Sequence, residues 1–341
     1  IDHSGYSVIS ATHLPEIQAD LVVYYHKKTY TEVMTLVPDD IEQDSVFGIS
    51  FRTLPESDNG VAHILMRSVL DGSKKFPLKD PFDELRRGSL QTYLKQFIFG
   101  DRTVYTCASR NSKDFSNLIA VNLDAVFDPS ILQEHGSWIF RQEGWRLEKR
   151  YQKYPNKEAQ YRFNGVVLET QKGAYSDPDL SIHKYAHRAL FPDTQYNYDN
   201  SGLPEEIVSV TRASLIEYHQ KYYHPSNAQV FLYGPLEDVT EGLKQVDDYV
   251  SAYDLNEDVR ENSSPKWQDK INKENSPREI HEYASTLENG DYRVMMSWLI
   301  NDRVMDAKTE IAWRMLNPGC MLDSPLFSAS SDAPCPKFMT G

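Results

Sequence analysis

The chain has 341 residues, more than one average domain contains, and this length predicts about two domains. Hydrophobic residues make up 40 % of it, enough for a sizeable core, but no apolar run approaches the roughly 20 residues that a membrane-spanning helix needs. The net charge of −14 argues against nucleic-acid binding, which requires clustered Lys and Arg to neutralise phosphates, and it is compatible with basic partners.

The three cysteines, Cys107, Cys320 and Cys335, are few and odd in number, so no disulfide framework is expected. No CxxC pair is present, which argues against a zinc site built from thiolates. A reducing compartment fits this cysteine usage best. The first residue is Ile1 and no targeting leader is visible, so we expect that a leader was removed or that the sequence starts inside a longer one.

Strand patterns open the chain, and helical patterns follow them. Continuous or alternating apolar residues predict strands at 21–25, 32–37 and 46–51. Apolar residues at helical spacing then predict helices at 61–70, from near Pro81, from near Ser89 and at 112–127. A strand is predicted at 103–109, before the last of these helices.

Mixed patterns continue to the end of a first α+β domain, which we place at residues 1–255. Further strands are predicted near 138–147, at 163–168 and at 227–233. Further helices are predicted at 177–190, 204–223 and 239–253.

Residues 256–277 are rich in Asn, Asp, Glu, Lys and Ser and read as a charged linker. Strand patterns at 279–284 and 292–300 and a helical pattern at 304–316 come after it, and the tail reads as loop. We therefore expect residues 278–341 to begin a second domain. This piece is too short to close its own sheet, so a partner or the rest of a longer chain is expected to cover it.

Residues 60–75, GVAHILMRSVLDGSKK, resemble the signature helix of presequence proteases, which belong to the pitrilysin/insulinase clan. In that family the helix holds His-x-x-Glu-His, in which two histidines bind zinc and the glutamate polarises the attacking water. Other segments resemble the family in the expected order, at residues 79–85, 88–90, 101–103, 123–127, 142–145, 189–193 and 222–228. The resemblance covers nearly the whole chain. It implies a mainly antiparallel sheet flanked by helices, followed by the start of a second similar domain.

The departures from the family pattern fall on the residues that do the chemistry. His63 keeps the first ligand position, but Met66 stands where the family has its catalytic glutamate. A thioether cannot accept a proton from water. Arg67 stands where the second histidine is expected, and a guanidinium is cationic and has no lone pair to give a metal.

The third ligand position departs as well. In residues 165–173, GVVLETQKG, the resemblance places Thr170 where the family has a glutamate ligand. Glu169 lies one position away, which on a helix is about 100° around the axis. One ligand of three remains, so the resemblance implies that this protein binds no zinc here, has no other cofactor and does not hydrolyse peptides.

Arg67 is expected to take over as the cation of this site. Acidic groups surround the zinc in the family, and a buried carboxylate without a counter-charge is costly. The partners that the sequence offers are Glu169, Glu84 and Asp71. The alternative is that Arg67 points into solvent.

Other candidate sites are weaker. Residues 94–96 replace an Asn-Ala pair that lies near the bound peptide in the family, and Lys95 there indicates an altered groove. His183 and His187 are four residues apart on a predicted helix, a spacing that metal ligands use, but no further ligand is clearly placed, and a solvent-facing or core role is expected. The motifs of serine hydrolases and of nucleotide-binding loops are absent from the sequence.

These features together predict a catalytically inactive presequence-protease-like protein that serves as a structural or scaffold subunit of a larger organellar complex. The expected partners are other protein subunits, including a second half-molecule covering residues 278–341. Two alternatives stay open: a non-cleaving, peptide-binding or regulatory protein, and an active zinc metallopeptidase with a rebuilt site. Because family members work in mitochondria or plastids, we expect a mitochondrial protein, with the plastid as the alternative.

Overall fold

The structure is a computed structural model that describes residues 3–40, 44–151, 159–268, 279–283, 292–299 and 304–322. The chain divides into two compact units. Unit 1 consists of Ile1–Gln268 and Pro277–Met296, and unit 2 of Asp269–Ser276 and Ser297–Gly341. The expected domain limits at residues 255 and 278 stay a prediction.

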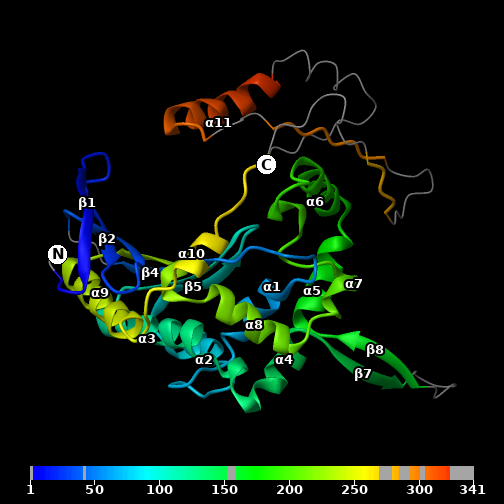
Figure 1. Ribbon diagram of the computed structural model, residues 1–341, viewed down its shortest axis with the longest axis horizontal. Coiled ribbons are helices and arrows are strands. Elements are labelled where there is room, and N and C mark those ends of the chain that lie inside the picture. The colour runs from blue at the N-terminus through cyan, green and yellow to red at the C-terminus, as the bar shows by residue number, and fades with distance from the viewer. Residues whose placement is uncertain are drawn as a thin grey trace. The chain divides into compact units, whose positions relative to one another are not determined.

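A seven-stranded sheet forms the centre of unit 1 (Figure 1). Its strands are, in spatial order, β1 (Tyr6–Leu14), β2 (Ala19–His26), β3 (Glu32–Pro38), β9 (Ala228–Tyr233), β4 (Ser45–Arg52), β6 (Arg102–Ser109) and β5 (Gln91–Ile98). All neighbours are antiparallel except β3 and β9. In the central strand β4, Phe47, Ile49 and Phe51 alternate into the core, as expected for a strand with one buried face. The expected mainly antiparallel sheet is confirmed.

Helices flank this sheet. Those of the first half are α1 (Val61–Ser68), α2 (Pro81–Gly88), α3 (Ser112–Phe127), α4 (Ser137–Glu143) and α5 (Val166–Tyr175). Those of the second half are α6 (Pro178–Leu190), α7 (Pro204–Ile207), α8 (Arg212–Tyr222), α9 (Leu236–Val250) and α10 (Glu257–Asn262). Single 3-10 turns lie at Ser130–Leu132, Glu134–Gly136, Gln195–Asn197 and Pro225–Asn227. Helices α3 and α9 pack on the central strands, and α1 packs on α8, α4 and β5.

A separate two-stranded hairpin, β7 (Arg146–Tyr151) with β8 (Ala159–Asn164), extends away from the large sheet (Figure 1). Sequence patterns predicted a strand near 138–147, but Trp138 to Glu143 lie in helix α4. The aromatic residues favour a strand by propensity, and packing of α4 against α1 decides otherwise. The strand predicted at 163–168 ends at Asn164, and the β-branched residues after it begin helix α5.

The helix predicted from near Ser89 is wrong, because this segment forms strand β5. Its pairing with β6 is irregular between Gln91 and Tyr93, and such an irregularity breaks the period of two that would mark a strand in the sequence. The strands predicted at 279–284 and 292–300 are not found in the described residues 279–283 and 292–299. Helix α10 lies inside the predicted linker.

The described part of unit 2 contains one helix, α11 (Ala307–Leu322), which confirms the helix predicted from residue 304 and continues into the predicted loop tail. Ile311, Trp313 and Met315 in it are exposed. Among the residues that the structure describes, no helix is long and apolar enough to cross a membrane.

Candidate functional site

Helix α1 is almost entirely buried, which explains its apolar composition. Of its eight residues only Val61 and Arg67 are partly exposed. The helix starts after Gly60, whose φ of 67° lies in the left-handed region that favours glycine. A Cβ at Gly60 would lie 2.7 Å from the carbonyl oxygen of Ser201. The start of α1 is therefore pressed against the Ser201–Gly202 backbone.

Gly60→Ala is expected to lower the free energy of unfolding by about 1–3 kcal/mol, the usual range for a non-glycine residue forced into such a conformation. Chemical denaturation measures this change. Gly88→Ala is the matched control, since no atom lies within 4 Å of a Cβ there, and it should leave stability unchanged or raise it slightly. Equal effects of the two substitutions would contradict the tight contact at Gly60.

His63 lies on the buried side of α1 and is held by its Nδ1 atom, which donates to the carbonyl oxygen of Ser201 at 3.2 Å. Burial lowers the pKa of His63, and the positive charges of Arg67 and Lys184 act in the same direction, so the ring is neutral near neutral pH. Because Nδ1 holds the proton, the lone pair is on Nε2, which has no hydrogen-bond partner among the described residues.

Helix α5 faces His63 with Gln171 rather than with Thr170. The buried Gln171 amide nitrogen lies 3.4 Å from His63 Nδ1, and its Oε1 accepts from Lys184 Nζ at 3.3 Å. Lys184 is also paired with Asp199, which accepts from Tyr175. The position beside His63 is therefore connected to a charged network on α5 and α6.

Thr170 and Glu169 are both turned away from His63. Thr170 is exposed, and its hydroxyl donates to the Val166 carbonyl oxygen at 2.8 Å in its own helix. Glu169 pairs with Arg162 at 2.6 Å and Lys172 at 2.8 Å, and the Lys172 hydrogen bond contributes most to lowering the pKa of Glu169. Glu169 does not take the place of a missing ligand.

Arg67 is bound to a carboxylate, as predicted, but none of the three predicted partners provides it. Its Nε atom donates to Oε2 of Glu143 at 2.6 Å, and the Glu143 side chain is only 4 % exposed. Glu143 belongs to α4, which packs against α1. The other carboxylate oxygen accepts from Gln142 at 3.0 Å. The Met66 side chain next to Arg67 in the sequence is buried and apolar.

Asp71, one of the predicted partners of Arg67, is buried without an ion pair among the described residues. Its Oδ2 atom has no hydrogen-bond partner there. Burial and the negative charges of Glu143 and Asp80 raise the pKa of Asp71 from its ordinary 3.8 to about 7, although Arg67 acts in the opposite direction. Because Arg67 pairs with Glu143, the negative charge of Asp71 has no ion-pair partner among the described residues.

Asp71 is expected to make stability depend on pH. Its pKa is higher in the folded than in the unfolded state, so the stability from its bound proton is complete below pH 3.8 and is lost as the pH rises to about 7. Asp71→Asn removes this loss. The free energy of unfolding of the variant, relative to that of the parent protein, should therefore be about 1–3 kcal/mol higher at alkaline pH than at acidic pH. Urea unfolding at about pH 4 and about pH 8 measures it. Parallel pH profiles of the two proteins would contradict the assignment.

The zinc ion that presequence proteases bind can be tested against these side chains. A zinc site needs three protein donors, and among His63, Met66, Arg67 and Thr170 only His63 presents a nitrogen lone pair. The guanidinium of Arg67 is a cation that already occupies a carboxylate, and the Thr170 hydroxyl is engaged in its own helix. This set of side chains does not fit zinc.

His183 and His187, the other predicted pair, do not belong to a metal-ligand group among the described residues. The His187 ring lies 4.8 Å from the ring of Phe191, in an aromatic cluster with Tyr196.

Strand β5, which contacts α1, is an edge strand of the sheet. Tyr93, Lys95 and Phe97 on it are exposed, and among the described residues β5 pairs with β6 alone, an arrangement that lets an edge strand pair with an extended chain.

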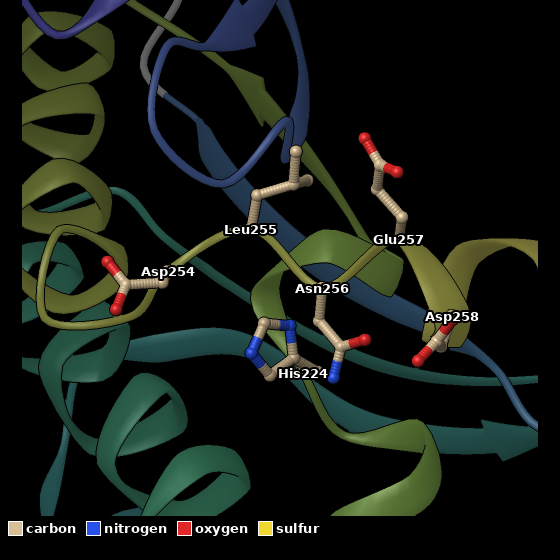
Figure 2. A pocket seen from close by; sticks show the side chains of 6 residues that line it. All are labelled: His224, Asp254, Leu255, Asn256, Glu257 and Asp258. Carbon is tan, nitrogen blue, oxygen red and sulfur yellow. The ribbon is translucent and has the colours of Figure 1, made fainter.

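A pocket of about 590 Å³, whose lining does not include His63, lies at the connection of α9 and α10 (Figure 2). His224, Asp254, Leu255, Asn256, Glu257 and Asp258 line it. The three carboxylates point away from one another in Figure 2, and Asp254 pairs with Lys28 at 3.1 Å. These acidic groups do not converge on one bound ion.

Comparison with known proteins shows which family the chain is similar to. A family model described as "Peptidase M16 inactive domain" matches residues 209–317. Presequence protease 1, chloroplastic/mitochondrial, of Arabidopsis thaliana is 36 % identical over 94 % of this chain and 29 % of the relative. The mitochondrial presequence protease of Xenopus laevis is 38 % identical over 68 % of this chain and 22 % of the relative, and Protein HypA of Clostridium perfringens is 43 % identical over 68 % and 23 %.

Among solved structures, the crystal structure of pitrilysin matches 75 % of this chain and 25 % of its own, with a TM-score of 0.56 and 15 % identity, which supports the fold alone. The chain spans less than a third of the length of the curated relatives named above. The matched relatives and the shared fold agree with the family resemblance of the sequence. The chain is a presequence-protease-like member of the pitrilysin/insulinase clan.

Proposed function

We propose that this protein is a non-catalytic presequence-protease-like protein that acts as a structural subunit of a larger organellar complex. The observation that supports it most is Arg67, which stands at a ligand position of the family motif and pairs with the buried Glu143. A fixed guanidinium there repels a divalent ion, and Met66 offers no base for activating water. The protein therefore keeps the fold for a purpose other than hydrolysis.

Exposed apolar side chains support a role in assembly. Tyr292, Val294 and Met296 in unit 1 are 92 %, 88 % and 65 % exposed, and they alternate along the chain. Such a row is expected to be covered by another protein surface. Partner subunits, or a second half-molecule, would cover it. Two of the named relatives, the presequence proteases of Arabidopsis thaliana and Xenopus laevis, are chloroplastic/mitochondrial and mitochondrial, which supports an organelle, with the mitochondrion as our proposal.

Native purification tests this proposal. The tagged protein is isolated from mitochondria under mild conditions, and its associated chains are identified and quantified. We expect other subunits in a fixed ratio to this chain. Recovery as a monomer, with no stoichiometric partner, would contradict the scaffold role.

A second function is favoured by the open edge of β5, namely capture of a peptide without cleavage. The exposed Tyr93 and Phe97 on this strand offer aromatic contacts, and its free backbone can pair with an extended peptide. Binding of a basic amphipathic peptide, measured by fluorescence anisotropy, tests it. Binding that is weakened by Tyr93→Ala would favour capture over the scaffold role, and absence of binding would exclude it.

A further inference from the structure

Three side chains that can bind metal meet at the far edge of the sheet from β5. His13 belongs to β1, Asp20 to β2, and Asp39 directly follows β3. Their candidate ligand atoms all lie within 4.8 Å of one another. In the described part of the chain this is the one group of three or more His, Cys, Asp or Glu side chains with such spacing.

The sheet itself places these residues on one face. His13 pairs directly with Asp20 across β1 and β2, so their side chains point to the same side. Asp20 pairs with Val37 across β2 and β3, and Asp39 lies two residues beyond Val37, again on that side. The Asp39 backbone nitrogen donates to the Gln18 carbonyl oxygen at 2.8 Å, which fixes the end of β3 beside the hairpin.

The electrostatic balance of the three side chains suits a divalent cation. Asp20 Oδ1 lies 2.9 Å from His13 Nδ1, and Asp39 Oδ2 lies 3.8 Å from His13 Nε2. Among the described residues neither carboxylate has a Lys or Arg partner. The two carboxylates together carry a charge of about −2, which one divalent ion neutralises.

We propose that His13, Asp20 and Asp39 bind one divalent transition-metal ion, such as Zn²⁺, through one imidazole nitrogen and two carboxylates. The donor atoms need to close to about 2.0–2.2 Å from the ion, a small movement for three exposed side chains. The three side chains are 48–64 % exposed, so water molecules can complete the coordination of the ion. This site is independent of the residues around His63 and of the proposed function.

Calorimetric titration of the full chain with Zn²⁺ near neutral pH tests the proposal. We expect binding of one ion that weakens at least about tenfold in His13→Ala and in Asp39→Asn, since even supporting groups of metal sites contribute 10–100-fold. His281→Ala is the matched control, because His281 is an exposed histidine that pairs with one carboxylate, Glu279 at 2.8 Å, and stacks on the Tyr185 ring. His63→Ala is the second control, and both should bind as the parent does.

Two results would overturn the site. One is the absence of Zn²⁺ binding by the parent protein; the other is equal weakening by His13→Ala and His281→Ala, which marks adventitious binding to surface histidines. Loss of binding in His63→Ala alone would overturn the site and also contradict the proposed function. Circular dichroism of each variant without metal shows whether the fold is intact, which we expect because His13 is half exposed on a hairpin.

Discussion

Arg67→Ala is expected to lower the free energy of unfolding by about 1–3 kcal/mol. Leaving a buried charged group without its partner costs somewhat more than this, and the cost is reduced here because solvent reaches the pair. The substitution leaves Glu143, whose side chain is 4 % exposed, with Gln142 as its remaining hydrogen-bond donor among the residues that the structure describes. It also removes the positive charge that opposes the raised pKa of Asp71. Because Arg67 itself is 36 % exposed, the loss stays below that of a fully buried pair.

Three matched variants separate this effect from a general loss of charge. Glu143→Gln should cost less than Arg67→Ala, because a freed guanidinium can turn toward water. Arg87→Ala removes an exposed pair with Asp83 on α2 and should change stability by less than about 0.5 kcal/mol. A double-mutant cycle of Arg67 and Glu143, followed by urea unfolding, gives their coupling. If Arg67→Ala behaved like Arg87→Ala, the pair would have no structural role.

Placing zinc ligands and a glutamate around His63 is expected to create a zinc site. The variant Met66→Glu, Arg67→His, Gln171→Glu supplies a second imidazole one turn along α1 from His63 and a carboxylate at the α5 residue that faces His63. Bound zinc should raise the free energy of unfolding by roughly 2.7 kcal/mol at about 100 times the dissociation constant. Thermal unfolding with and without Zn²⁺ measures this, in a His13→Ala background that removes the surface site.

Arg67→His alone is the control for this triple variant. It should bind no zinc at α1, because α5 then faces His63 with the Gln171 amide and supplies no carboxylate. Zinc binding by the single variant would show that fewer changes separate this protein from a metal-binding one. Failure of the triple variant to bind zinc, with its fold intact, would show that the arrangement of α1 and α5 has also changed.

Sequence reasoning located the position of Arg67 but not its partner. The helical spacing of α1 was evident in the sequence, and so was the expectation that Arg67 pairs with a carboxylate. Glu143, however, lies 76 residues away in the chain, on a helix that was predicted as a strand. Its contact with α1 depends on tertiary packing, which local patterns do not contain. The family-like segment at residues 142–145 was the one signal that pointed toward it.

Two further differences have the same origin. The register of α5 placed Thr170 at the ligand position, whereas Gln171 approaches His63, because the rotation of a helix about its axis is set by what it packs on. Strand β5 was predicted as a helix because its irregular start disturbs the alternation. By contrast, helix α3 followed from a strong periodic pattern and the mainly antiparallel sheet from the family resemblance, and the structure contains both.

The zinc content of the native protein, compared with that of His63→Ala, tests the non-catalytic role most directly. Both proteins are purified without chelators, and their zinc is measured by atomic emission. We predict the same zinc content in the two, since His63 is the one zinc ligand of the family motif that remains here and a single ligand does not hold zinc. Stoichiometric zinc in the native protein that is lost in His63→Ala would contradict the account.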